Sequence, residues 1–312
     1  MNNLNIGILI VAFNRDEHLK KVLSFFDFKL KYPIYIYIDG PRNDYDIMKQ
    51  RSILKILQNK RISNKRIKRN AINLGCKYSI PLAIEWFFKN SDCEICVILE
   101  DDCVPGNEFI QFIVEKANFL EKPQFGIICG TYPIKINIEK KIECISTRYG
   151  LIHGWAISRN TWLNLKSELF NRRKLPKNIP FTEKLFWKLT TLKVETGILD
   201  TWDAHFNTYM LAKNLHNIAP THNLVTNIGY DQFATHSTKE TEIKMRRGNY
   251  ADLYFDNKIH EFNADHIISK YFFNIKKYKA PVWVIKIIFL SLFRKKIKLQ
   301  YCFQQNMKNL FI

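Results

Sequence analysis

The sequence has long stretches that contain no acidic residue. Among its 312 residues, 48 are Lys or Arg and 29 are Asp or Glu, so the formal net charge is +19. No acid occurs between Asp46 and Glu85, and none follows Asp265, while basic residues gather in both stretches. Basic surfaces attract phosphate-rich partners such as nucleotides, nucleic acids and anionic lipids. An ordinary solvated face is the alternative for the first stretch.

Two glycine-rich nucleotide-binding motifs are also absent. No G-x-G-x-x-G follows the first apolar run, which argues against a dinucleotide-binding Rossmann domain. No G-x-x-x-x-G-K-[ST] occurs, which argues against a P-loop NTPase. The basic stretches lack interleaved aromatic residues and match no named nucleic-acid-binding motif, so we expect no nucleic-acid partner.

A secretory signal is not recognisable at the start, where MNNLN has no basic residue and the apolar run 6–13 is short. We therefore expect a cytoplasmic protein, with its seven cysteines as free thiols. Cys93 and Cys96 form a C-x-x-C with Cys103 nearby, but a zinc site needs four well-placed ligands. We interpret Cys96 as part of a buried strand instead.

What the sequence does contain is an alternation of strand-like and helix-like segments. Apolar runs at 5–13, 34–39, 93–100 and 125–132 suggest buried strands, with a shorter one at 66–73. The segments between them have helical spacing of apolar residues; Pro81 suits the first turn of the helix expected at 79–90. This order predicts an α/β fold with a mostly parallel central sheet and helices on both faces.

Polar residues follow these strands at the edge where ligands bind in such sheets. The run VILEDDCVPG carries Glu100, Asp101 and Asp102 directly after an apolar strand, and three adjacent carboxylates repel one another. A hard divalent cation removes that repulsion, and Mg²⁺ or Mn²⁺ completes its coordination with substrate phosphates. The run therefore suggests a metal–diphosphate site. The alternative is a solvated acidic turn in which Asp102 caps the following helix.

Several segments together resemble GT-A glycosyltransferases, above all the N-acetylglucosaminyltransferase I group, and also bacterial glycosyltransferases of surface-polysaccharide loci. The similar segments lie in order over residues 5 to 240: ILIVAFNR, YIYIDG, NLGCKYSIPLAI, VILEDDCVPGNEFIQF, HGWAISRNTW and TWDAHF. The resemblance implies a GT-A (Rossmann-like) fold and an inverting, metal-dependent hexosyl- or N-acetylhexosaminyltransferase. Its donor would be a nucleotide sugar, with a UDP-sugar expected, and its acceptor a hydroxyl of a glycan or a lipid-linked sugar.

The resemblance also implies roles for individual residues. Asp102 would bind Mn²⁺ or Mg²⁺, with His236 in FATHS as a second ligand or an ordinary loop histidine. The donor would be bordered by residues at the strand ends and at one turn, namely Ala12, Asn14, Arg15, Asp39, Gly75, Lys77, Glu100 and Asp101.

An inverting transferase also needs a general base that takes the proton of the acceptor hydroxyl. Asp200 and Asp203 in LDTWDAHF are both candidates, and the resemblance favours Asp203 as the base. Asp200 or Thr201 would cap a helix from about residue 202, and His205 is a weaker candidate for the base. Under the opposite interpretation, Asp203 only adds charge to the first helical turn.

The expected organisation is a catalytic domain at 1–245, with a donor half at about 1–130 and an acceptor half at about 131–245, followed by a basic C-terminal helical extension at 246–312. As a helix, the apolar run 281–293 would span about 20 Å, short of a membrane core of about 30 Å. It suits the inner surface of an anionic cytoplasmic membrane, packing on the protein, or a contact between copies of the chain.

Two other functions are compatible with parts of the pattern. A sugar-1-phosphate nucleotidyltransferase shares the layout and also needs acids and Mg²⁺, but VAFNRDEHL lacks the glycine-rich basic signature expected after the first strand. A non-catalytic nucleic-acid-binding protein would account for the positive charge alone. The combined motifs favour the glycosyltransferase.

Overall fold

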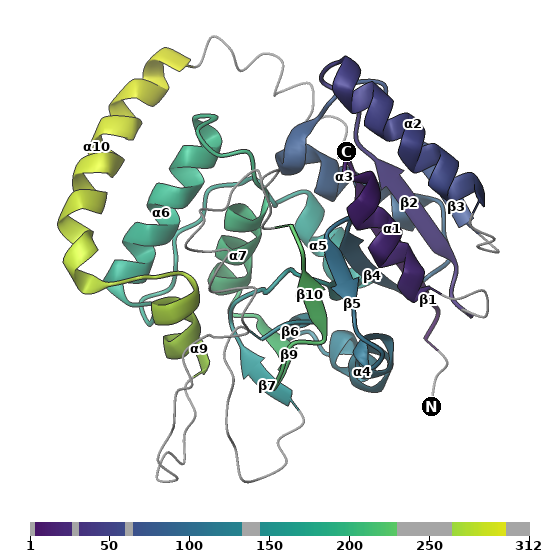
Figure 1. Cartoon of the computed structure of the whole chain (residues 1–312). Coiled ribbons are helices and arrows are strands. Elements are labelled where there is room, and N and C mark those ends of the chain that lie inside the picture. The colour runs from purple at the N-terminus through teal and green to yellow at the C-terminus, as the bar shows by residue number, and fades with distance from the viewer. Residues whose placement is uncertain (1–3, 27–30, 60–64, 133–143, 230–263, 298–312) are drawn as a thin grey trace.

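The structure is a computed structural model that describes residues 4–26, 31–59, 65–132, 144–229 and 264–297, with side chains described to Leu292. Its centre is an eight-stranded sheet in the order β3-β2-β1-β4-β8-β6-β9-β7 (Figure 1). A second sheet pairs β5 with β10.

The first half follows the expected alternation. Its strands are β1 (Ile6–Ala12), β2 (Ile34–Ile38), β3 (Lys65–Arg69) and β4 (Ile95–Glu100), and all four are parallel neighbours. The helices that connect them are α1 (Asp16–Phe25), α2 (Asp44–Asn59) and α3 (Gly75–Lys89). Three of these strands bury every residue, or all but one, because helices cover both faces.

The second half completes the sheet with two strands that run against the rest. After β5 (Cys103–Pro105), α4 (Phe109–Lys116) and a 3₁₀ turn (Ala117–Glu121) come β6 (Phe125–Cys129), β7 (Cys144–Thr147) and β8 (Trp155–Ser158). Then follow α5 (Arg159–Lys166), α6 (Phe181–Glu195), α7 (Asp203–Ala212), β9 (His216–Pro220) and β10 (Val225–Asn227). β8 is antiparallel to β4 and β6, and β7 is antiparallel to β9.

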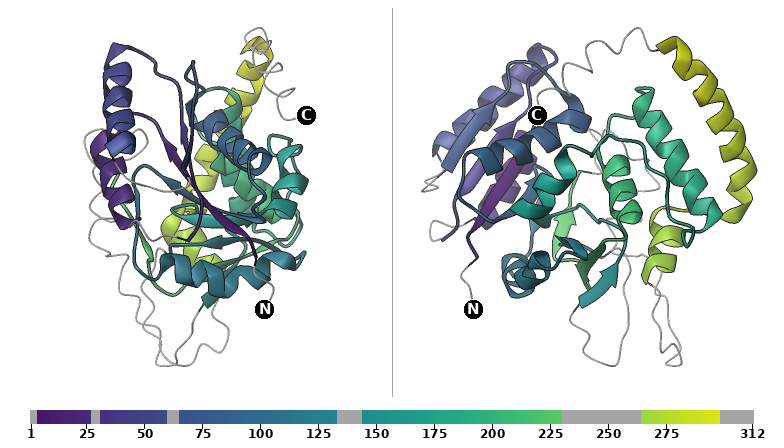
Figure 2. Two further views of the ribbon diagram at one scale, coloured as in Figure 1. Left: turned by 90° about the vertical axis from the view of Figure 1, so that its right-hand side faces the viewer. Right: turned by 180° about the vertical axis from the view of Figure 1, so that it is seen from behind.

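Alternate residues of each strand enter two different cores. Along β1, Leu9 and Val11 belong to the core formed with α3, α5 and α7, whereas Ile8 and Ile10 belong to the core formed with α1, α2 and α4. The edge-on view of Figure 2 shows helices on both sides of the sheet. The expected α/β class, mostly parallel sheet and helices on both faces are confirmed.

The C-terminal helical extension is also confirmed. It comprises α9 (Ala264–Ile267), a π turn (Ile268–Phe272), a 3₁₀ turn (Lys277–Lys279) and α10 (Ala280–Ile297), which lies outside α6 (Figure 1). The position expected for Pro81 was wrong. Because α3 already begins at Gly75, Pro81 lies inside the helix rather than in its first turn.

Candidate functional site

The acidic run after β4 is attached to the end of β1. The backbone N–H of Phe13 donates to Asp101 Oδ2 at 3.0 Å, and the Arg15 guanidinium donates to Asp102 Oδ2. Arg15 Nη1 also lies 3.6 Å from Asp101 Oδ1. Burial alone would lower the pKa of Arg15, but Asp101 and Asp102 outweigh it and raise that pKa. One guanidinium therefore bridges two of the three carboxylates.

A single arginine does not neutralise three acids. Burial, followed by repulsion from Asp102 and Asp101, raises the pKa of Glu100. Burial also raises the pKa of Asp101, against the attraction of Arg15. The strand end thus carries surplus negative charge in a poorly solvated place, which a cation would relieve.

The carboxylates of the acidic run fit a divalent cation that takes most of its ligands from water and from the substrate phosphates. Within the described ranges, no group of three His, Cys, Asp or Glu side chains forms a ready ligand cluster. Mg²⁺ and Mn²⁺ often take only one or two protein carboxylates and complete their shell with water and phosphate oxygens. Asp102 would serve as one such carboxylate, in place of its present ion pair with Arg15.

Gly229 lies against the Asp102 carboxylate, a contact that no sequence pattern predicted. The Ile228 N–H donates to the backbone oxygen of Asp102 at 2.8 Å, just after β10 pairs with β5. A Cβ atom on Gly229 would lie 2.0 Å from Asp102 Oδ2 and 2.9 Å from Arg15 Nη1. Only glycine fits there. The signal available in the sequence was a lone glycine in a loop 127 residues after Asp102.

At the end of β2, Asp39 organises the turn that starts α3. Its carboxylate accepts hydrogen bonds from the backbone N–H groups of Gly40, Leu74 and Gly75 at 2.9–3.2 Å. The side-chain amides of Asn70 and Asn73 donate to it as well. Burial raises the pKa of Asp39, and these hydrogen bonds oppose the rise. The acid therefore holds the carboxyl ends of β2 and β3 together beside the site.

Two further residues expected at the donor lie at the end of β1. The Ala12 side chain is buried in the core, and the Ala12 carbonyl accepts from the Asp39 N–H at 3.0 Å. The Asn14 amide donates to Asp46 Oδ1 at 2.6 Å. Asp46 also accepts from Arg42, whose guanidinium lies 4.7 Å from the centre of the Phe13 ring. Residues 12–14 thus form one wall of the site through backbone and amide contacts.

Asp200 caps α3 rather than the helix that follows it in the sequence. Its carboxylate accepts from the N–H groups of Cys76 and Lys77 at 2.9 and 3.0 Å. Gly75 has φ +71°, and a Cβ on it would lie 2.4 Å from Asp200 Oδ2. The expectation that Asp200 or Thr201 caps α7 was wrong. Lys77 is buried with its Nζ 3.5 Å from the Val194 carbonyl and 5.0 Å from the Tyr78 ring centre.

Asp203 is the first residue of α7, as the helix expected from about residue 202 implies. The Thr201 hydroxyl donates to Asp203 Oδ1. The preceding residue, Trp202, is buried and stacks on Trp155, with ring centroids 5.4 Å apart. The side chain of Asp203 is half-exposed. The buried Trp202 next to it packs on Trp155 of β8 and so fixes the start of α7 to the sheet.

These acids share one region with His153, which the sequence reasoning passed over. Burial lowers the pKa of His153, while Asp102 and Asp203 both act to raise it. Burial raises the pKa of the Cys76 thiol, and Glu100, Asp203, Asp200 and Asp102 raise it further. Asp102 and Asp203 therefore both lie within electrostatic range of His153 and Cys76. The signal in the sequence was the His that precedes the Gly-Trp pair.

Two other histidines, His205 and His236, were candidates from the sequence. His205 is 2% exposed, packs edge-on against Phe170 and has its pKa lowered to about 3 by burial and by Lys77. Its position two residues after Asp203 points it to the other side of α7, so it is no candidate for the base. His236 lies outside the described residues.

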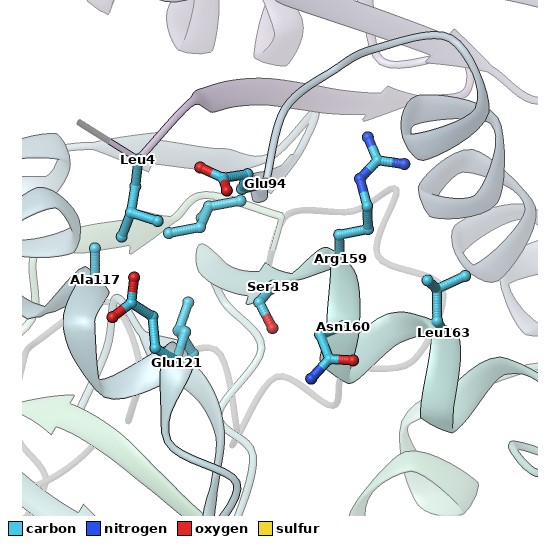
Figure 3. Close-up of a pocket in the computed structure, with 10 residues that line it drawn as sticks. Leu4, Glu94, Ala117, Glu121, Ser158, Arg159, Asn160 and Leu163 are labelled. Carbon is cyan, nitrogen blue, oxygen red and sulfur yellow. The ribbon is translucent and has the colours of Figure 1, made fainter. Parts of the chain in front are cut away.

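A hollow of about 310 Å³ lies at the other end of β4, next to Ile95 (Figure 3). Its lining combines apolar residues with Glu94, Glu121 and Arg159. The Arg159 guanidinium donates to the backbone oxygens of Phe88, Ser91 and Cys93. The hollow is separate from the site at Asp102, which follows the carboxyl end of the same strand.

No family model matches the chain, and no curated protein matches it in sequence. Among solved structures, residues 1–349 of S. aureus TarS in complex with UDP-GlcNAc align over 99% of this chain and 90% of that one, with 12% identity and a TM-score of 0.45. The mannosyltransferase PcManGT from Pyrobaculum calidifontis, in complex with GDP-Man and Mn²⁺, aligns over 93% and 86%, with 9% identity and a TM-score of 0.40. A cytidylyltransferase from Leptospira borgpetersenii aligns over 55% and 66%, with 12% identity and a TM-score of 0.33.

The structures similar to this chain thus include glycosyltransferases, the class that the sequence motifs resemble. At these TM-scores the likeness supplies no argument about chemistry. The closer resemblance to the N-acetylglucosaminyltransferase I group stays a prediction.

Proposed function

We propose that this chain is an inverting, metal-dependent glycosyltransferase. It moves a hexosyl or N-acetylhexosaminyl group from a nucleotide sugar, expected to be a UDP-sugar, to a hydroxyl of a glycan or lipid-linked acceptor in bacterial surface polysaccharide synthesis. The observation that supports this most is the shared environment of Asp102 and Asp203, which brings an acid suited to a cation and an acid suited to a base to one site. The proposed setting is the cytoplasm.

In the proposed mechanism, Asp203 takes the proton of the acceptor hydroxyl as that oxygen attacks the sugar. The Thr201 hydroxyl fixes the orientation of the carboxylate, and the stacked Trp202 fixes the start of α7. Asp102 and Asp203 both act to raise the pKa of His153, and we assign its imidazole to the region between the acceptor and the donor phosphates.

Asp102 would hold Mn²⁺ or Mg²⁺, which would offset the charge that develops on the leaving diphosphate. Arg15 neutralises Asp102 in the described structure. With Asp102 holding a cation, the guanidinium of Arg15 would be placed to bind a phosphate of the donor. Glu100 and Asp101 would then hold metal-bound water, ribose or sugar hydroxyls, and Asn14 and Asp39 would border the nucleoside.

We propose that the two halves of the chain carry different groups of the site. Residues 1–130 supply β1, β2 and β4 with the donor groups, and residues 131–245 supply His153 and Asp203 on the acceptor side. Residues 246–312 form an extension that carries no residue proposed for chemistry, and His236 remains a proposed second ligand.

A hydrolysis assay tests this function. The purified chain is incubated with a panel of nucleotide sugars and Mn²⁺, and release of the nucleoside diphosphate is measured. We expect Mn²⁺-dependent release, reduced about 100-fold or more by Asp102→Ala. Glu115→Gln removes an exposed carboxylate from α4 and serves as the control. Release that survives Asp102→Ala contradicts the assignment. Pyrophosphate release from a nucleoside triphosphate would instead indicate a nucleotidyltransferase, and a salt-sensitive DNA shift without hydrolysis a nucleic-acid binder.

A further inference from the structure

The last helix, α10, has one face packed on the protein. Trp283 and Ile287 are buried against Leu185, Leu189 and Leu192 of α6. Figure 1 and the right-hand view of Figure 2 show α10 as the outermost element beside α6. The expectation that this segment packs on the protein is therefore confirmed for one of its faces.

The opposite face of α10 is apolar and exposed. Val282, Ile285, Ile288 and Leu292 follow one another at spacings of three and four residues, so they form one stripe along the helix. Their exposed fractions are 51%, 68%, 56% and 67%. Tyr278, just before the helix, is 71% exposed. A continuous apolar stripe of this kind marks an interaction surface more often than chance exposure.

The charges around this stripe are all positive. Lys276 and Lys277 are exposed before the helix, and Lys286 is exposed within it. The sequence of the last turn contains Arg294, Lys295 and Lys296, and no acid follows Asp265. An apolar stripe with basic residues at both ends matches a surface that combines acyl chains with anionic headgroups.

We propose that the exposed face of α10, defined by Val282, Ile285, Ile288 and Leu292, docks on an anionic lipid surface. A second copy of the chain is the weaker fit, since it would bring together two molecules of charge +19 through lysine-bordered faces. The part of the chain that the structure describes contains no helix with the length and hydropathy of a membrane span. A helix with one apolar face and basic residues at its ends binds in the plane of the lipid surface. This docking does not rest on the proposed function.

The full chain is mixed with sucrose-loaded vesicles of phosphatidylcholine alone or with phosphatidylglycerol, and bound protein is measured after sedimentation. We expect binding to the anionic vesicles only, and a loss of about tenfold or more in the double variant Ile285→Glu/Leu292→Glu. The control is Met48→Glu/Val114→Glu, which makes the same charge change at exposed apolar positions on α2 and α4. It should stay within about twofold of the unchanged chain.

Three results overturn the proposal. The unchanged chain could fail to bind anionic vesicles, or both double variants could lose binding equally, which would indicate charge alone. The third is a dimer of the unchanged chain in sedimentation velocity that does not bind vesicles and that dissociates in the Ile285→Glu/Leu292→Glu variant. That result would show that a second copy of the chain covers the face. Nucleotide-sugar hydrolysis without lipid is measured in parallel and should be equal in all variants, so failure of docking and failure of the proposed function remain separable.

Discussion

The indoles of Trp155 and Trp202 stack with their centroids 5.4 Å apart and their planes at 23°. Trp155 opens β8 beside His153 and Gly154, and Trp202 precedes Asp203 at the start of α7. The stack joins two motifs that lie 47 residues apart in the sequence. A tryptophan thus lies close in sequence to each of His153 and Asp203, and the stack fixes the two segments to each other.

Two substitutions of Trp202 should distinguish its contribution to folding stability from its role in positioning α7. Trp202→Ala should lower the free energy of unfolding by about 3–5 kcal/mol, because a fully buried aromatic side chain is removed. Trp202→Phe keeps most of the burial and should remain folded, yet transfer should fall more than donor binding because α7 is less firmly placed. Urea unfolding and steady-state kinetics measure the two effects. Full stability and activity in both variants would remove the role of the stack.

Gly229→Ala should disrupt Asp102 without replacing any side chain that is proposed for chemistry. The added Cβ would lie 2.0 Å from Asp102 Oδ2, so the loop or the carboxylate must move. We expect loss of the stabilisation by Mn²⁺ and nucleotide sugar that a thermal shift detects. Gly197→Ala is the control for a glycine substitution without a steric clash, since no atom lies within 4 Å of the added Cβ. Gly197 has a φ of +75°, whereas Gly229 has no positive φ, so only the control carries backbone strain. Equal loss of the thermal shift in both variants would show that contact with Asp102 is not responsible.

Asp200→Ala should loosen the start of α3. The N–H groups of Cys76 and Lys77 lose their acceptor, and removal of a capping acid costs about 1 kcal/mol, within a range of about 0.5–2. Amide hydrogen exchange should accelerate at residues 75–78 and remain unchanged in α1. Asp44→Ala, which removes an exposed acid from the first turn of α2, is the matched control. Unchanged exchange at residues 75–78 would contradict the cap.

Glu85 should give a defined pH dependence of stability. Burial alone would raise its pKa, but hydrogen bonds from Trp162 at 2.9 Å and Lys166 at 3.0 Å outweigh it, and the pKa is lowered. Its contribution is therefore complete above the pKa of an unfolded glutamate and is lost as the pH falls through the lower folded value. Glu85→Gln should be less stable at neutral pH, and the difference should shrink between about pH 5 and pH 3 in urea unfolding. A difference that grows on acidification would reverse the sign of this argument.

The sequence predicted best those elements whose structure depends on residues close to one another in the chain. Continuous apolar runs identified β1, β2 and β4 because these strands are buried on both faces, and the polar residues that follow them met at one edge as expected. Strand β8 was missed because it has four residues and enters the sheet antiparallel, between β4 and β6. Nothing in a four-residue run specifies that pairing.

Site residues were missed for the same reason. Asp200 lies 124 residues from Cys76, and its capping role exists only because α7 begins beside α3. Gly229 lies against Asp102, and the charges of Asp102 and Asp203 act on His153, through a chain arrangement that no local pattern encodes. Asp102 and Asp203 could be predicted as site residues because each lies in a recognisable motif at the end of an element.

The central claim is that Asp203 acts as the base in a site whose donor half is centred on Asp102. Asp203→Asn keeps the size and the contact with Thr201 but removes the acid. Donor binding is measured by calorimetry with Mn²⁺ and transfer by product formation, once a donor and an acceptor sugar are identified. We predict a donor Kd within about threefold of the unchanged chain and transfer reduced about 100-fold or more. Transfer at the full rate in Asp203→Asn would contradict the account.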